Sequence, residues 1–177
     1  ANPRYYSDDY QNANGTTTTN KGNVNGHIIR WREDGGRGTA TRFAWDIYLF
    51  GAQADAPADV NLSGLTAVND FSSPDGLHFD DRGLLWIETD DGAYTDVTNC
   101  MLLAAVPGRV GDGGSATAAG GTATFKGANA SEQTVRRFLT GPVQCEITGI
   151  ALTPDYKTLF INIQHPGEDG TLAAPTS

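Results

Sequence analysis

The chain has 177 residues, with 21 acidic against 12 basic side chains and a formal net charge of −9. A surface for nucleic acid or anionic membrane needs clustered lysine and arginine, and the densest basic groups are only Arg30–Arg32 and Arg136–Arg137. No apolar stretch approaches the ~18 residues of a membrane span. We therefore expect neither nucleic acid nor membrane as a partner. The acidity serves solubility, or else some carboxylates converge to hold hard cations.

The chain begins with a polar stretch and continues with strand-like segments. Residues 1–25 are rich in Asn, Thr and Gly without a period, which predicts an extended arm or loop. Residues 26–31 (GHIIRW) and 42–51 (RFAWDIYLFG) are β-branched and aromatic, which predicts two strands. No segment keeps an i, i+3, i+4 apolar pattern over three turns, so the sequence favours an all-β fold.

A near-repeat lies between residues 75 and 165 of the chain. Residues 75–90 (DGLHFDDRGLLWIETD) and 148–165 (TGIALTPDYKTLFINIQH) both read as a strand, a polar turn with Asp, and a second strand. Two more strands are predicted between the copies, at residues 100–107 and 134–139. The intervening Gly/Ala/Thr tract, residues 108–133, is interpreted as a long, mobile insertion.

Four strands per repeat unit are typical of a β-propeller blade. We therefore predict that residues 26–177 form a partial β-propeller of about two to three four-stranded antiparallel blades. An unrelated β-sandwich with similar hairpins is the alternative. Because propellers close with four to eight blades, we expect a piece of a larger protein, or a chain that associates through its open strand edges.

Carboxylates stand at the ends of the predicted strands. Asp75 opens the first strand of the repeat, and Glu146 precedes its second copy. Glu88 and Asp90 are two residues apart, so they share a strand face with Trp86. Such carboxylates can converge at one mouth of a propeller channel, where Ca²⁺ takes six to eight oxygen ligands. The alternative is that each is a solvated turn or cap residue.

The sequence does not decide the roles of several other residues that could act as ligands or reactive groups. Cys100 and Cys145 can form a disulfide, remain buried thiols, or supply a ligand to a transition metal. Pro166 ends the last strand, so Gln164 and His165 either face a site or cap the sheet. The sequence contains no phosphate-binding loop, no His-Glu-x-x-His motif and no Gly-x-Ser-x-Gly motif. No catalytic residue is assigned.

Four segments, in this order, resemble the PhoX-type alkaline phosphatases. They are GHIIRWRED with RFAWDIYLFG, then SPDGLHFDDRGLLWIETDDG, then VRRFLTGPVQCEITGIALTPD, and finally TLFINIQHPGE. The family consists of secreted or periplasmic phosphomonoesterases, exported by the twin-arginine route, with a propeller fold and a site for calcium and iron. The resemblance implies metal-site positions at Asp75, Glu88, Asp90 and Glu146.

The resemblance also implies a function, and it implies that this chain is only part of a family member. It implies calcium and iron as cofactors, phosphate monoesters as substrates, and a periplasmic or secreted location. Family members are several times longer, so we expect a carboxy-terminal fragment that is not active alone and needs its missing amino-terminal part or a homo-oligomer. The alternatives are a non-catalytic, self-assembling propeller fragment and a calcium-stabilised binding module.

Overall fold

The computed structural model describes residues 10–11, 17–18, 24–90, 98–119, 121–171 and 173–174. Within them the fold is built from antiparallel strands, and the one helical segment is a short 3-10 turn, η2 (Asp34–Gly36). The strands are β1 (Tyr10–Gln11), β2 (Thr17–Thr18), β3 (His27–Glu33), β4 (Phe43–Phe50), β5 (Pro74–Phe79), β6 (Leu85–Thr89), β7 (Met101–Ala105), β8 (Ser115–Thr117), β9 (Ala123–Phe125), β10 (Val135–Thr140), β11 (Glu146–Leu152) and β12 (Leu159–Gln164). The predicted all-β fold is confirmed. In the described part of the chain, no helix has the length and apolarity needed to cross a membrane.

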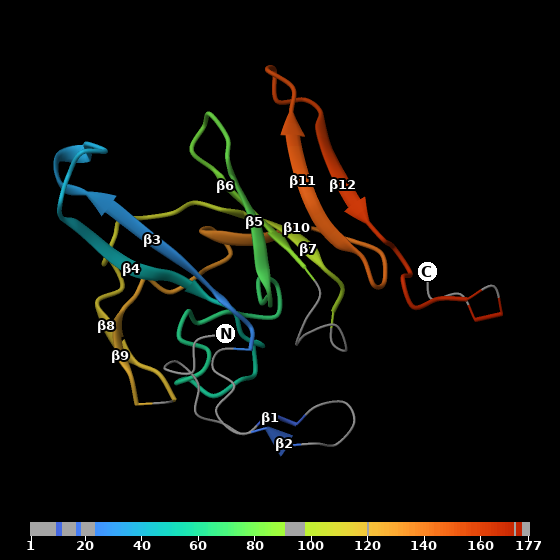
Figure 1. The fold of residues 1–177 in the computed structure, drawn as a ribbon, viewed down its shortest axis with the longest axis horizontal. Helices are drawn as coiled ribbons and strands as arrows, with labels where there is room; N and C mark the ends of the chain where they lie inside the picture. The colour runs from blue at the N-terminus through green and yellow to red at the C-terminus, as the bar shows by residue number, and fades with distance from the viewer. Residues whose placement is uncertain are drawn as a thin grey trace.

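A four-stranded sheet occupies the centre of the molecule, in the order β5-β6-β7-β10. Each pair within it is antiparallel, and the β8–β9 hairpin is inserted between β7 and β10 in the sequence. Figure 1 shows this sheet between the β3–β4 hairpin and the β11–β12 hairpin. One sheet thus has the composition expected of a blade, whereas the flanking hairpins are two-stranded. The propeller arrangement itself stays a prediction.

Both faces of the central sheet are covered, because successive side chains of a strand point to opposite faces. All five residues of β6 are buried. Leu85 and Ile87 pack on one side, in the same cluster as Ile28 of β3. Trp86 packs on the other side, in a cluster with Ile147 of β11. The sheet is therefore the middle layer between the two hairpins.

The near-repeat corresponds to two equivalent hairpins. The β5–β6 hairpin closes on the Phe79–Leu85 pair, and the β11–β12 hairpin closes on the Leu152–Leu159 pair. Their turns lie next to each other, since the guanidinium of Arg82 is 4.2 Å from the ring centroid of Tyr156. A bulge interrupts each hairpin near its open end. The predicted strand–turn–strand repeat is therefore confirmed as a structural repeat.

The tract at residues 108–133 is more regular than expected. It contains the β8–β9 hairpin, which packs beside β4, and the backbone N–H of Gly127 donates to the carbonyl of Ile47 at 2.9 Å. A side chain at Gly127 would collide with the backbone of Tyr48, so glycine permits this close approach. Ala118 is buried in a small cluster with Ile47 and Leu62. The tract therefore contains a hairpin that the sequence did not predict, because small residues allow tight backbone packing. Its mobility stays a prediction.

The amino-terminal stretch is described only in part. The two-residue strands β1 and β2 pair antiparallel with each other. Most of the predicted arm at residues 1–25 lies outside the described residues, so the boundary between arm and propeller at residue 26 stays a prediction.

Candidate metal centre

Three potential ligands meet at one end of the β11–β12 hairpin. One oxygen each of Asp90 and Glu146 and one ring nitrogen of His165 lie within 4.8 Å of one another. Glu146 begins β11 and pairs with Gln164, the last residue of β12, so His165 follows at the same edge. Asp90 directly follows β6, and its backbone N–H donates to the carbonyl of Ser73 at 3.1 Å. Three strand ends therefore supply one cluster.

Hydrogen bonds orient two of these side chains. The amide Nε2 of Gln164 donates to Oε2 of Glu146 at 2.9 Å, and Nε2 of His165 lies 3.6 Å from the same oxygen. On the other side of the ring, Nδ1 of His165 is 3.2 Å from the carbonyl oxygen of Gln144 and 3.4 Å from a carboxylate oxygen of Glu168. The imidazole is thus held between two acidic side chains.

The backbone at His165 is unusual for a non-glycine residue. Its φ is 35°, in the left-handed region that L-amino acids rarely adopt. Strained positions of this kind often lie at ligand-binding sites, where the surrounding contacts maintain them. Here the contacts of the ring with Gln144, Glu146 and Glu168 are the interactions that accompany this conformation.

Glu88 brings a buried carboxylate to the same region. It is 5% exposed, on the face of β6 that packs toward β11. Its side chain crosses the backbone of β5 at Gly76, where a methyl group would overlap the carboxylate. Burial raises the pKa of the Glu88 carboxyl, and the charges of Asp75 and Glu146 raise it further, while His78 opposes them. Glu88 is therefore in electrostatic contact with residues of β5 and β11.

Burial and neighbouring charges together shift the pKa values in the cluster. Burial raises the pKa of Glu146, and Asp90 and Asp75 raise it further against the opposing effect of His165. Burial alone would lower the pKa of His165, but the Gln144 carbonyl and the neighbouring carboxylates outweigh it and raise that pKa. Carboxylates that resist ionisation beside one another favour a bound cation.

The structure brings together all four carboxylates that the sequence singled out. Asp90 and Glu146 share the ligand cluster, and Asp75 interacts with both Glu88 and Glu146. Asp75 is exposed at the second position of β5.

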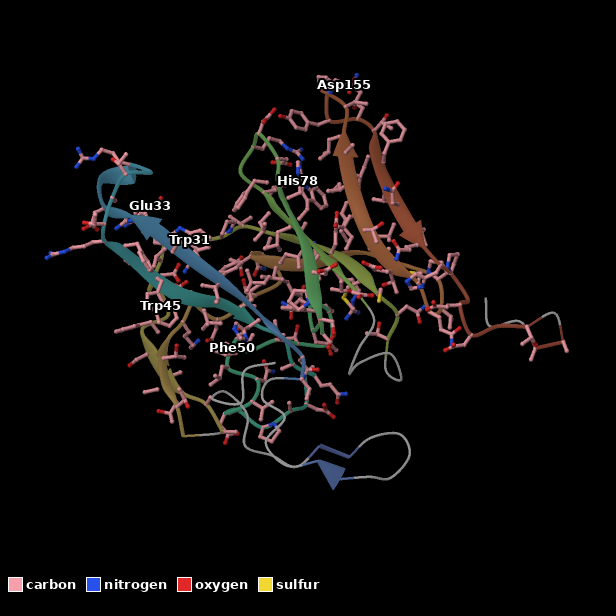
Figure 2. The ribbon with its side chains drawn as sticks, viewed as in Figure 1. Trp31, Glu33, Trp45, Phe50, His78 and Asp155 are labelled. Carbon is pink, nitrogen blue, oxygen red and sulfur yellow. The ribbon has the colours of Figure 1, made fainter. Side chains whose placement is uncertain are left out.

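Three further residues were placed only by the tertiary structure. His165 and Gln164, which the sequence left between a site and a cap, lie in the cluster. His78, which sequence reasoning did not select, acts on Glu88 from β5, where it pairs with Trp86 in the strand register and is labelled in Figure 2. The only sign of this role in the sequence was that His78 directly precedes Phe79, the apolar residue that ends β5.

The two cysteines lie outside the ligand cluster. Cys100 and Cys145 are both buried in the apolar cluster that contains Trp86. Cys145 has no exposed surface, although Glu146 directly follows it. A role for Cys145 as a metal ligand therefore receives no support from its surroundings.

The donor set fits a hard cation with one softer position. Carboxylate oxygens are the ligands that Ca²⁺ prefers, and the cluster offers them from Asp90 and Glu146 with Asp75 and Glu88 close by. The imidazole of His165 adds a nitrogen donor that suits a transition metal such as iron. The residues present thus fit both kinds of ion.

Fold and site together define an all-β protein with an acidic, cation-compatible cluster where its strands end. The sequence profile described as alkaline phosphatase PhoX matches residues 5–167. Because that match covers most of its length, the chain belongs to the PhoX alkaline phosphatase family. The comparison with curated proteins gives no match.

A solved structure supports the assignment. The chain resembles the Pseudomonas fluorescens PhoX in complex with vanadate, a transition state analogue, with 37% sequence identity and a TM-score of 0.62. The similarity covers 84% of this chain and 23% of that chain. The chain therefore spans about a quarter of the length of the solved protein that it matches.

Proposed function

We propose that the chain is the carboxy-terminal part of a PhoX-like alkaline phosphatase and contributes metal ligands for the hydrolysis of phosphate monoesters. The observation that carries the proposal is the convergence of Asp90, Glu146 and His165, with Asp75 and Glu88 beside them, in a chain of this family. The carboxylates suit calcium as ligands, and the imidazole suits iron.

Each residue has a distinct part in this proposal. Asp90 and Glu146 supply oxygen ligands, and Gln164 holds the Glu146 carboxylate in place through its amide. His165 supplies nitrogen through Nε2 while Nδ1 is held by the Gln144 carbonyl, as a second partner usually holds a ligating imidazole. When bound, the metal ions would neutralise phosphoryl oxygens and increase the nucleophilicity of an oxygen.

The site is proposed to be incomplete in this chain alone. Similarity to the Pseudomonas protein covers 23% of that protein, so most of its length has no counterpart in this chain. We infer that the chain binds cations but does not hydrolyse phosphate monoesters without the missing amino-terminal part or further copies. A periplasmic or secreted location is part of the same proposal, by analogy with the family.

Cation binding tests the proposal directly. Terbium replaces calcium at oxygen-rich sites, and Trp86, two residues from Glu88 on the same strand face, can sensitise its luminescence. We expect saturable terbium luminescence that calcium competes away. Substitution of Glu146→Gln should weaken it, whereas Glu132→Gln at an exposed turn should not. Identical titrations of the two variants would contradict the proposed site.

Activity is tested in a protein that carries the whole family length. In Pseudomonas fluorescens PhoX, the residues at the positions that align with Asp90 and Glu146 are replaced by alanine, and hydrolysis of p-nitrophenyl phosphate is measured with calcium supplied. We expect activity to fall at least tenfold in each variant, with the isolated chain at background. Full activity in both variants would remove the proposed role.

Self-assembly without catalysis is the second candidate. It is favoured by large apolar side chains that remain exposed on several strands, among them Trp31, Phe43 and Phe79, each 60% exposed. Light scattering of the 18.7 kDa chain separates this candidate from the first. A stable monomer that binds calcium would exclude assembly as its function and leave the calcium-stabilised binding module as the remaining rival.

A further inference from the structure

The segment that follows His165 folds back onto the loop that leads into β11. It consists of residues 166–170 (PGEDG), and we call it the strap. The backbone N–H of Gly167 donates to the carbonyl of Val143 at 2.8 Å. The N–H of Gly170 donates to the carbonyl of Gly167, also at 2.8 Å, and closes a tight turn. The strap is therefore attached to the loop from which β11 starts.

Gln144 and Asp169 join the strap to this loop through two reciprocal hydrogen bonds. Nε2 of Gln144 donates to Oδ2 of Asp169 at 3.1 Å. The backbone N–H of Asp169 donates to Oε1 of Gln144, also at 3.1 Å. The two bonds use both the donor and the acceptor of one side-chain amide, so they fix the orientation of that amide. The partners are 25 residues apart in the sequence, so only the tertiary structure shows this pair.

Two backbone conformations beside this pair are unfavourable by themselves. Gln144 has a φ of 56° and His165 has a φ of 35°, both in the left-handed region that residues other than glycine rarely adopt. His165 also precedes Pro166, and a residue before proline favours an extended backbone. Such conformations persist only where surrounding contacts maintain them. The Gln144–Asp169 pair joins the two segments that carry these conformations and supplies contacts of this kind.

The contacts of Nδ1 determine which ring nitrogen of His165 carries the proton. The carbonyl oxygen of Gln144 lies 3.2 Å from Nδ1, and a carbonyl can only accept a hydrogen bond. Glu168, in the strap, places a carboxylate oxygen 3.4 Å from the same nitrogen. On the other side, Glu146 lies 3.6 Å from Nε2, beyond the length of a good hydrogen bond. The neutral ring therefore favours hydrogen on Nδ1 and keeps the lone pair on Nε2.

We propose that Gln144 and Asp169 are positioning residues for His165: their reciprocal hydrogen bonds hold the Gln144 carbonyl against Nδ1, so that the neutral ring presents Nε2 to a cation. The cation rests on the function proposed above, whereas the place of the proton on the ring does not. An imidazole that ligates a metal usually has a partner on its other nitrogen. Here that partner is a backbone carbonyl, and the strap keeps it in place.

Nitrogen NMR of the chain without metal observes the proton on the ring. At about pH 9, where an imidazole is neutral, long-range proton–nitrogen spectra distinguish the two tautomers. The chain has three histidines, and His165→Gln identifies the signal of this one. We expect the Nδ1–H tautomer to predominate in the wild type, and its ratio to the Nε2–H tautomer to fall about threefold to tenfold in Asp169→Ala. A proton mainly on Nε2 in the wild type, or an unchanged ratio in Asp169→Ala, would overturn the proposal.

Conservative variants separate positioning from charge. Asp169→Asn keeps an acceptor oxygen for the Gln144 amide and loses only the negative charge, so it should retain the wild-type tautomer ratio. Gln144→Asn is one methylene shorter and tolerates a left-handed backbone. It should shift the ratio while the urea midpoint stays close to that of the wild type. A shift in Asp169→Asn as large as in Asp169→Ala would assign the effect to charge and overturn the proposal.

The turn at the other end of the β11–β12 hairpin supplies the control. Asp155 is also exposed, and it accepts hydrogen bonds from the hydroxyl of Thr153 at 2.6 Å and the N–H of Lys157 at 3.2 Å. Asp155→Ala should loosen that turn and leave the tautomer ratio of His165 unchanged. Equal shifts in Asp155→Ala and Asp169→Ala would show that the stability of the hairpin sets the tautomer, and would overturn the proposal.

Cobalt binding distinguishes this proposal from the proposed function. Co²⁺ accepts imidazole ligands, and its visible absorption reports binding. We expect Asp169→Ala to bind Co²⁺ about threefold to tenfold more weakly than the wild type, and Asp169→Asn to bind about as tightly. Unchanged affinity in Asp169→Ala would overturn the presentation of Nε2 to a cation. A wild type that shows the expected tautomers but binds neither Co²⁺ nor calcium would support the positioning pair and remove the proposed metal site.

Discussion

Nε2 of His165 lies 3.6 Å from Oε2 of Glu146, across the ends of β12 and β11. The strand register brings them together, because Glu146 pairs with the residue immediately before His165. Burial and the negative charges of Asp90 and Asp75 raise the pKa of Glu146, and His165 opposes them. A bound cation would act in the same direction as His165 and lower that pKa.

Removal of the charge of Glu146 should weaken cation binding. Glu146→Gln keeps the size of the side chain and an acceptor oxygen but loses one negative charge. We expect calcium affinity to fall about tenfold or more, which corresponds to about 1.4 kcal/mol. Isothermal titration with calcium measures it, and Glu132→Gln at an exposed turn is the matched control. An unchanged dissociation constant for Glu146→Gln would argue against ligation by this residue.

A methyl group at Gly76 should displace Glu88. Gly76 lies in β5 directly beneath the Glu88 carboxylate, so Gly76→Ala forces that buried side chain to move. We expect weaker terbium binding and a loss of stability of about 1–3 kcal/mol, typical of overpacking. Gly38→Ala is the control, because Gly38 has open space around it. Urea unfolding and terbium titration are measured for both variants. Equal urea midpoints and equal terbium affinities would contradict a fixed position of the Glu88 side chain.

Replacement of the buried Asp46 should destabilise the fold. Asp46 has no exposed surface, accepts hydrogen bonds from Nε and Nη2 of Arg30, and also accepts one from the N–H of Gly111. Asp46→Asn leaves the Arg30 guanidinium with less compensation, so we expect a loss of about 3 kcal/mol in the free energy of unfolding. Asp55→Asn, at an exposed position, should change it by less than about 0.5 kcal/mol. Equal unfolding midpoints for the two variants would contradict this role.

Acid should weaken the β5–β6 turn through Asp80. Burial alone would raise the pKa of Asp80, but hydrogen bonds from Arg82, the N–H of Leu84 and the indole of Trp86 outweigh it and lower that pKa below its usual 3.8. A carboxyl with a lowered pKa in the folded state stabilises the protein above its unfolded pKa, and this contribution disappears as the pH falls through the folded pKa.

We therefore expect the stability of the chain to fall below about pH 4, and Asp80→Asn to reduce the steepness of this fall. Urea midpoints measured from pH 7 down to pH 2.5 provide the measurement. Asp59→Asn, which is exposed, should retain the wild-type profile. If Asp80→Asn keeps the full acid dependence, other carboxyls must account for it.

Much of the local structure could be predicted because its signals are local. Alternating apolar residues and turn residues identified the strands, and similar patterns identified the two hairpins as a repeat. The sequence did not predict the β8–β9 hairpin within residues 108–133, where a tract of Gly, Ala and Thr carries little hydrophobic pattern. That tract forms a hairpin because its small residues allow it to approach β4 closely, which is a tertiary effect.

The sequence identified the carboxylates of the candidate site, but it did not identify the other residues that lie beside them. Asp75, Glu88, Asp90 and Glu146 were recognisable as acidic residues at strand ends and from the family resemblance. His165 entered the ligand cluster only because β11 and β12 pair in a register that brings its ring to Glu146. The sequence by itself determined which residue types stand at the strand ends, since strand and turn preferences act over a few residues. Only the tertiary structure decided which of them meet, because that depends on contacts between residues as distant as Asp90 and Glu146.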